Sequence, residues 1–253
     1  MGQRRSPLGV VELERVAARG WPGLAQDRLG DWLLRAGEGF TGRANSALVV
    51  GNPGLPLDDA VAAVGRWYDE RGLVPCAQLP GVQSRAADAA FARAGWARDE
   101  DVLVLTAPLT PPTADVAAAA DVVLSPAPDD AWLAGYQHHG GPLPDAAVRV
   151  LTAGEGLVFA SVRLDPAPAP LAAVGRGALA DGWLGITALT VAEEHRRRGL
   201  ATAVTAALQR WAAERGATSA YLQVTAGNAG ARELYRRLGF IEHHRYHYRR
   251  RVG

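Results

Sequence analysis

The sequence predicts a mixed α/β fold in which helices flank a mostly antiparallel sheet, with two similar units in tandem. Short apolar strand segments alternate with amphipathic helical segments in both halves of the chain. A Pro- and Ala-rich segment at 107–120 lies between the halves and is typical of a linker. The sequence at the end of a predicted helix in the first half is repeated in the second half. We therefore expect a domain at 1–106, the linker at 107–120 and a domain at 121–253.

The first domain is expected to alternate strands with helices. Its strand segments are short apolar runs bounded by turn-forming residues, and its two helical segments carry apolar residues at helical spacing. In chain order we predict strands at 31–35 and 47–50, a helix at 58–71, a strand at 76–79, a helix at 85–94 and a strand at 101–105.

The second domain is expected to contain more strands and two longer helices. The helix after the third long strand is well patterned, because Leu200, Val204, Leu208 and Trp211 recur at helical spacing. In chain order we predict a strand at 122–124, helices at 129–136 and 145–152, strands at 157–164, 171–179 and 183–191, a helix at 200–215, a strand at 221–224, a helix at 228–239 and a final strand or hairpin at 241–249.

The two halves share a repeat at a constant offset of 144 residues. Arg66–Gly72 matches Arg210–Gly216 at five of seven positions, and the same offset places Gly95-Trp96 on Gly239-Phe240. The offset needs no gap. A constant offset favours duplication of one unit over chance similarity in an Ala- and Arg-rich chain. We therefore expect the first half to be a second, degenerate copy of the same unit.

A turn rich in Arg and Gly precedes the helix at 200–215. Its residues are Arg196, Arg197, Arg198 and Gly199. The first N–H groups of a helix have no partner within the helix, and the helix dipole adds positive charge there. Gly199 has no Cβ to block an approaching anion. The turn therefore suits a phosphate or diphosphate, although the same pattern also fits a solvated basic turn.

A second pattern follows the predicted strand at 221–224. Asn228 is a favourable N-cap for the next helix, and Ala231, Leu234 and Tyr235 follow it on one helical face. Gly239 then ends the helix. A single helical tyrosine is usually a core or surface residue, so the information lies in the spacing of Tyr235 from Asn228 and Gly239.

Together these two patterns resemble the GNAT acetyltransferase superfamily, whose members transfer an acyl group from acyl-coenzyme A to an amine. The resemblance covers residues 121–253 and is strongest from Gly182 to Phe240. It implies that Tyr235 is the general acid for the leaving thiolate and that a backbone N–H near Leu189 stabilises the oxyanion. The residues that it implies for binding acetyl-CoA are Leu189, Thr190, Val191, Arg196, Arg197, Arg198, Gly199, Leu200, Ala201, Thr202, Asn228, Ala231 and Tyr235.

The chain departs from the family pattern in two places. Glu193 stands where many members have Pro, which affects the rigidity of the turn. The strand at 186–191 has no carboxylate where many members place a general base; Thr187 and Thr190 are its only polar side chains. The base is therefore a water, Glu193, Glu194 or a histidine elsewhere, and the sequence does not choose among them.

The first half lacks the residues that this chemistry needs. In place of the Arg/Gly turn it has Gly51–Asp59, in which Pro53 and Pro56 remove backbone donors and two aspartates would repel a phosphate. Phe91 stands at the offset position of Tyr235, without the hydroxyl. We therefore expect one cofactor site per chain, in the second half.

Composition excludes several classes of protein. The net charge is +1, so charge alone predicts neither a nucleic-acid nor a membrane partner. The single Cys76 excludes an intramolecular disulfide and a cysteine metal cluster. His243, His244 and His247 have no partner at metal-ligand spacing, so we expect no metal. The absence of a long apolar stretch and of a signal-peptide core predicts a cytoplasmic protein.

The sequence thus predicts an acetyl-CoA-dependent N-acetyltransferase that acts by direct attack in a ternary complex, because no nucleophile is placed for a covalent intermediate. A non-catalytic acetyl-CoA-binding regulatory module is the alternative from another class. The acceptor is an amine, and a peptide, an aminoglycoside, a polyamine and an amino acid all fit the sequence. The pattern does not decide the oligomeric state.

Overall fold

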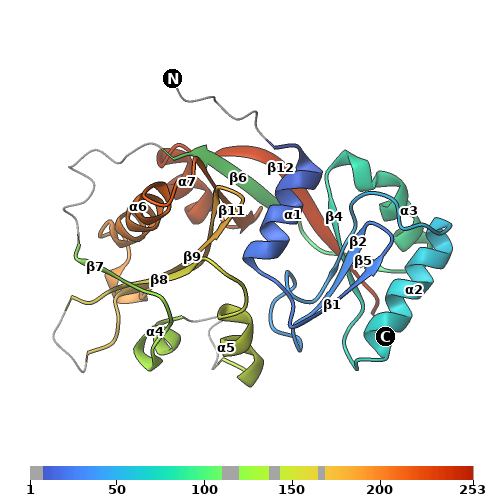
Figure 1. Cartoon of the computed structure of the whole chain (residues 1–253), viewed down its shortest axis with the longest axis horizontal. Helices are drawn as coiled ribbons and strands as arrows, with labels where there is room; N and C mark the ends of the chain where they lie inside the picture. The colour runs from blue at the N-terminus through green and yellow to red at the C-terminus, as the bar shows by residue number, and fades with distance from the viewer. Residues whose placement is uncertain (1–7, 110–119, 137–142, 165–168, 253) are drawn as a thin grey trace. The chain divides into compact units, whose positions relative to one another are not determined.

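The computed structural model describes residues 8–109, 120–136, 143–164 and 169–252 (Figure 1). The chain divides into two compact units. Unit 1 comprises Met1–Val102 together with His243–Gly253, and unit 2 comprises Leu103–Glu242. The mixed α/β class with mostly antiparallel strand pairing is confirmed in both units.

Unit 1 is a mixed sheet with helices on both faces. The strand order is β1-β2-β3-β4-β12, and β5 also pairs with β12. Among the strand pairs described for this unit, β3 and β4 are parallel and the others are antiparallel, and a parallel pair is expected where a helix crosses over between two strands. The elements are α1 (Val10–Gly20), β1 (Ala25–Leu29), β2 (Trp32–Ala36), β3 (Ala47–Leu48), α2 (Leu57–Asp69), β4 (Cys76–Pro80), a 3-10 turn (Val82–Ser84), α3 (Arg85–Arg93), β5 (Ala97–Arg98) and most of β12 (Ile241–Arg250).

The two faces of the unit 1 sheet differ in chemistry. On the face covered by α2 and α3, Trp32, Val64, Leu79 and Phe91 form an apolar core. On the face covered by α1, the neighbouring β4 residue Gln78 enters a buried polar network.

Glu14 is the centre of that network. Its Oε2 accepts a hydrogen bond from Gln78 Nε2 at 2.8 Å, and its Oε1 lies 2.8 Å from His244 Nε2. Both side chains of the Glu14–His244 pair are at most 4% exposed. Arg35 donates to Gln78 Oε1 and to Ser46, which satisfies the far end of the network. These contacts connect α1, β4 and β12.

Unit 2 carries a longer sheet with the strand order β6-β11-β10-β9-β8-β7. The β7–β8, β8–β9 and β9–β10 pairs are antiparallel, whereas β10 and β11 are parallel. The elements are β6 (Val102–Pro108), β7 (Val122–Ser125), α4 (Asp130–Gly135), α5 (Asp145–Leu151), β8 (Leu157–Val162), β9 (Ala173–Ala180), β10 (Trp183–Val191), a 3-10 turn (Glu193–His195), α6 (Leu200–Ala213), β11 (Ser219–Thr225) and α7 (Ala229–Arg237).

Glycines on β9 bring α6 close to the sheet. An added Cβ on Gly175 would lie 2.6 Å from Val204 Cγ1, and one on Gly177 would lie 3.3 Å from Leu208 Cδ2. The intervening Arg176 points to the opposite face, where its Nε donates to Leu151 O at the end of α5. The absence of side chains at Gly175 and Gly177 therefore fixes the position of α6 and of the turn that precedes it.

Most predicted elements are present with ends shifted by a few residues, but α1, β1, β5 and the two short 3-10 turns were not predicted. The α1 segment buries Glu14 on its apolar face, which interrupts the helical pattern. The β1 strand is almost wholly exposed, and β5 has two residues, so neither has an apolar alternation. Residues 110–119 of the predicted linker lie outside the described residues.

The C-terminal strand differs from the expected domain boundary. We assigned 121–253 to one domain, yet β12 pairs with β4 through Tyr246–Arg250 and with β5 through Arg249–Arg250. Residues 243–253 therefore belong to unit 1. The physical reason is long-range pairing: alternation along a strand shows which side chains are buried, but it does not show which edge the strand joins.

Candidate functional site

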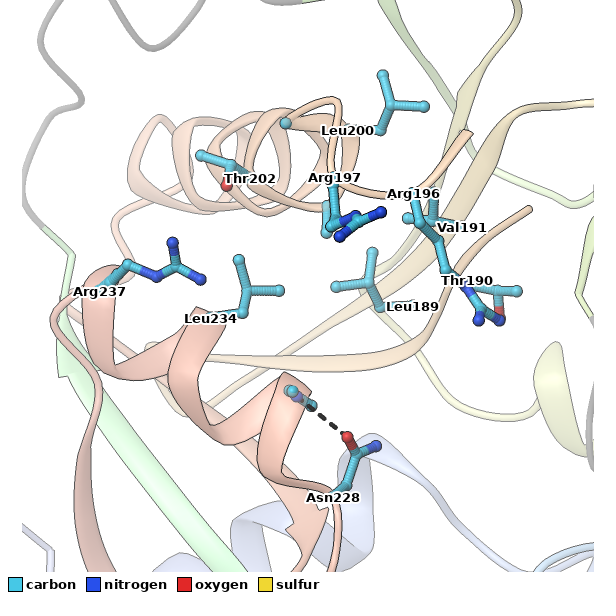
Figure 2. A pocket seen from close by; sticks show the side chains of 14 residues that line it. Leu189, Thr190, Val191, Arg196, Arg197, Leu200, Thr202, Asn228, Leu234 and Arg237 are labelled. Carbon is cyan, nitrogen blue, oxygen red and sulfur yellow. Dashed lines mark hydrogen bonds between the residues drawn. The ribbon is translucent and has the colours of Figure 1, made fainter. Parts of the chain in front are cut away.

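A cavity of about 620 Å³ opens in unit 2 between the end of β10, the start of α6 and one face of α7 (Figure 2). Backbone and side-chain groups from three elements thus meet at one site. The residues that line it are Leu189, Thr190, Val191, Arg196, Arg197, Gly199, Leu200, Ala201, Thr202, Asn228, Gly230, Ala231, Leu234 and Arg237.

The β10 strand contributes an edge that separates from its parallel neighbour. Pairing between β10 and β11 ends at Ile186–Leu222, although β10 continues to Val191 and β11 to Thr225. On its other side, β10 continues to pair with β9 at Thr190–Val174 and Val191–Ala173. The backbone of the last β10 residues therefore faces the cavity along one edge, which suits pairing with an extended, amide-containing ligand.

A β-bulge in β10 lies just after the point where β10 separates from β11. The β9–β10 register shifts between Thr187 and Thr190, and Ala188 has a φ of 52°, in the left-handed region. A bulge bends the strand and redirects the residues that follow. It therefore positions Leu189, the first β10 residue of the cavity wall.

The turn before α6 presents unpaired backbone donors. Gly199 is the N-cap with a φ of 79°, and Arg197 also has a left-handed φ, of 59°. No side chain caps α6, and no acidic residue lies in its first turn. The first bond of the helix runs from Ala203 N to Gly199 O, so the N–H groups of the three preceding residues lack helical acceptors. With Arg196 and Arg197 beside them, these donors form a concavity whose charge and geometry suit an anion.

The α7 helix forms the opposite wall. Asn228 Oδ1 accepts a hydrogen bond from Ala231 N at 3.0 Å and caps the helix (Figure 2). This cap is the one that the sequence predicts. It places Ala231 and Leu234 against the cavity.

Tyr235 follows Leu234 but packs into the apolar core. Its ring meets Phe240 edge to face with centroids 5.7 Å apart, and the residue is 8% exposed. Burial raises the pKa of Tyr235 to about 12. The phenol is therefore protonated throughout the neutral range, so it is a hydrogen-bond donor and not a base.

The cavity collects every predicted cofactor residue except Arg198 and Tyr235. Arg198 instead lies 3.2 Å from His195 Nδ1. Three lining residues were missed in the sequence: Gly230, Leu234 and Arg237. The sequence analysis placed Leu234 on this helical face without assigning it to the cofactor. Leu234 and Arg237 lie four and seven positions after Gly230, so following the helical period from Gly230 would have found both.

The candidate bases in the turn lie apart from the described lining. Glu193 is 86% exposed on its side chain and lies 3.8 Å from Arg196, so its interaction with that arginine is weak. Neither Glu193 nor Glu194 lines the cavity. Thr187, in the bulge region, interacts with Arg176.

Other functional classes find little support in the described part of the chain. His244 is paired with Glu14, and His247 with Asp88. Within the described ranges, no group of three His, Cys, Asp or Glu side chains could hold a metal ion. The same part of the chain has no helix that is long and apolar enough to cross a membrane.

Solved structures identify the fold of this chain. A GCN5-related N-acetyltransferase from Kribbella flavida superposes with a TM-score of 0.72, covering 98% of this chain and 97% of that one at 19% identity. A tandem GNAT protein from the clavulanic acid biosynthesis pathway has a TM-score of 0.61, covering 99% and 90% of the two chains at 16% identity. The fold is therefore that of the GNAT acetyltransferases.

Sequence relatives narrow the class to a family. The family model described as "Probable histone acetyltransferase Rv0428c C-terminal" matches residues 9–249, and the chain belongs to that family. The Mycobacterium tuberculosis protein named "Probable histone acetyltransferase Rv0428c" is 34% identical over 94% of this chain and 73% of its own length. The Bacillus subtilis protein "Uncharacterized N-acetyltransferase YobR" is 29% identical over 95% and 98%.

Proposed function

We propose that this chain is an acetyl-CoA-dependent N-acetyltransferase with one cofactor site, in unit 2. The observation that carries the proposal is the combination in one cavity of a separated strand edge and an uncapped, Arg-flanked helix start. The strand edge complements the amide-containing pantetheine arm of coenzyme A, and the helix start complements its diphosphate. A free phosphate would use only the helix start.

The reaction follows from the groups around the thioester. A neutral amine attacks the acetyl carbonyl, the tetrahedral oxyanion collapses, the C–S bond breaks, and the nitrogen gives up one proton while the thiolate gains one. We assign stabilisation of the oxyanion to a backbone N–H near Leu189, and the position of Leu189 on the cavity wall just after the bulge supports this role.

Tyr235 assists the departure of the thiolate. A free thiol has a pKa of about 8.5, below that of the buried phenol, so complete proton transfer from the phenol is uphill. Tyr235 therefore acts mainly as a hydrogen-bond donor while charge develops on sulfur.

The attack is direct because the chain's cysteine is unsuited to an acyl-enzyme. Cys76 lies in unit 1 and is fully buried. Burial raises the pKa of its thiol to about 12, so the thiolate is scarce at neutral pH. Amine and acetyl-CoA then bind together before the chemical step.

We further propose that unit 1 is a degenerate copy of the same structural unit. Helices α3 and α7 cover positions that differ by 144, and each ends in an equivalent bond: Trp96 N to Phe91 O at 3.1 Å and Phe240 N to Tyr235 O at 3.0 Å. Both aromatic pairs are edge to face, with ring planes at 65° and 66°. Such agreement supports duplication more strongly than the sequence repeat does.

The unit 1 copy lacks the features of the cofactor cavity. Helix α2 begins after Pro56 and has Asp58 and Asp59 in its first turn, whereas α6 begins after Gly199 with no acid. These carboxylates oppose a diphosphate at that helix start.

The test is calorimetric titration with acetyl-CoA, followed by an assay of free thiol release with an amine panel. The panel should contain a polyamine, an aminoglycoside, free amino acids and a lysine peptide, the last because a relative is named as a probable histone acetyltransferase. We expect one acetyl-CoA per chain and thiol release with at least one amine. A stoichiometry of two would overturn the single site, and binding without turnover would favour the regulatory module.

A matched pair of variants tests the location. Thr202 lines the cavity in the first turn of α6. Thr202→Glu places a carboxylate where the helix dipole favours it but where it repels a diphosphate, whereas Thr202→Gln has the same shape without charge. We expect T202E to weaken acetyl-CoA binding at least 10-fold relative to T202Q without loss of thermal stability. Equal affinities would place the diphosphate elsewhere.

A further inference from the structure

Arg237 is a cation on the cavity wall that does not belong to the Arg/Gly turn. It lies in the last turn of α7 and lines the cavity. Figure 2 shows its guanidinium at the end of the cavity where Leu234 and Thr202 lie, while Thr190 lies at the other end. The cavity wall therefore carries positive charge at two places: Arg196 and Arg197 in the turn before α6, and Arg237 on α7.

The contacts of Arg237 leave its terminal nitrogens available within the described structure. Its Nε lies 3.4 Å from Glu233 O and 3.4 Å from Glu233 Oε1. Arg236 occupies both carboxylate oxygens of Glu233 at 2.9 Å, which offsets the charge of that carboxylate. The two contacts of Arg237 use Nε alone, and its side chain is 66% exposed. It is thus placed to bind an anion with its outer nitrogens.

Coenzyme A carries an anion that the proposed contacts have not yet used. Its thioester arm is assigned to the β10 edge and its diphosphate to the α6 turn. A third phosphate, a monoester on the ribose, lies beyond the diphosphate at the end remote from the thioester. A phosphate monoester has a second pKa near 6, so it carries close to two negative charges at neutral pH.

We propose that Arg237 binds this ribose 3′-phosphate and makes the site select acetyl-CoA over acetyl-dephospho-CoA and over acyl groups on carriers that lack this phosphate. The inference rests on the proposed function, since it names which acyl thioester the same cavity takes. Arg237 is then a specificity-determining residue that acts on the cofactor and not on the reacting atoms.

The test compares two ligands on three proteins at constant ionic strength. Dissociation constants for acetyl-CoA and acetyl-dephospho-CoA are measured with the natural chain, with Arg237→Gln and with Arg232→Gln. Arg232 is the matched control because it lies on the same helix and is exposed but does not line the cavity; its Nη1 donates to Ala226 O. A charge-assisted contact at an exposed site corresponds to roughly 10-fold in affinity.

We expect the natural chain and R232Q to prefer acetyl-CoA by roughly 10-fold and R237Q to bind both ligands within about 2-fold. Equal affinities in the natural chain, or an equal loss of both ligands in R237Q, would overturn the role of Arg237 and leave the cofactor site standing. If R232Q lost the preference for acetyl-CoA to the same extent, the preference would come from the general charge of α7, and the proposal would also be overturned. Failure of the natural chain to bind either ligand would instead remove the proposed function itself.

Discussion

At the scale of a single residue, Tyr235 shows how burial selects among chemical roles. The ring lies in the core of unit 2, and its raised pKa keeps the proton on the phenol. A buried tyrosine of this kind donates a hydrogen bond, and it cannot relieve an ammonium of its proton at neutral pH. The proton of the attacking amine must therefore leave by another route, through water or a side chain beyond the lining residues.

Replacing Tyr235 with Phe removes the donor and keeps the ring in the core. We expect kcat for thiol release to fall by about 10²- to 10⁴-fold, while the dissociation constant of acetyl-CoA and the thermal midpoint change little. Steady-state assays at saturating acetyl-CoA, with calorimetry beside them, measure both. Full turnover in Y235F would remove Tyr235 from the mechanism.

Residue-level features of the site were predictable where they are local. The Asn228 cap and the Gly199 turn depend on a few neighbouring residues, and both were found in the sequence. The bulge was not, because Ala188 adopts its left-handed φ without the glycine that usually signals one. Arg237 was missed for a different reason: it lies one helical turn after Leu234, and the face was not followed beyond Tyr235.

At the scale of elements, the packing of α6 against β9 determines where the turn before α6 lies. Gly175 and Gly177 let the helix approach the strand without intervening side chains. Close packing of this kind leaves no room for an added methyl group. The position of the α6 start therefore depends on a strand that does not line the cavity.

Gly175→Ala should shift α6 and weaken the cofactor site from a distance. The new Cβ would meet Val204 Cγ1 at 2.6 Å, so we expect a loss of about 1–3 kcal/mol in the free energy of unfolding, together with weaker acetyl-CoA binding. Chemical denaturation and calorimetry measure these two effects.

A second substitution serves as the control. Val204→Ala trims the side chain that clashes, so the double variant should recover part of the stability lost in G175A, beyond simple addition of the two effects. Strict additivity would show that the clash is relieved elsewhere.

Element types were easier to predict than partners. The helix at 200–215 and the strand at 183–191 carry strong periodicity and were placed almost correctly. β12 was recognised as a strand, but its pairing with β4 joins positions about 170 residues apart, and no local pattern encodes that choice. The exposed β1 strand has no apolar alternation, so its sequence signal is weak.

At the scale of the whole molecule, buried acids predict how stability responds to alkali. Burial raises the pKa values of Tyr68, Tyr246 and Tyr248, and it raises those of Tyr235 and Cys76 to about 12. In the unfolded chain these phenols and the thiol ionise at about pH 10 and about 8.5 respectively. The unfolded state therefore releases protons first, and stability falls as pH rises from about 9 to 12.

For Tyr235 alone, the free energy of unfolding falls by roughly 1.4 kcal/mol per pH unit between the pKa values of the unfolded and folded states. Urea midpoints measured from pH 7 to 11 should stay level and then decline, and Y235F should decline less steeply above pH 10. A profile that is flat to pH 11 would mean that these groups are solvated in the folded protein.

The assignment of β12 to unit 1 also has a consequence for synthesis of the chain on the ribosome. All of Leu103–Glu242 emerges before the strand that completes the unit 1 sheet. Until then the nascent chain displays an unpaired β4 edge, and Glu14 has no histidine partner. Domains usually mature in the order in which they are translated. Here the unit whose synthesis begins first cannot complete its sheet until the end of the chain has been made.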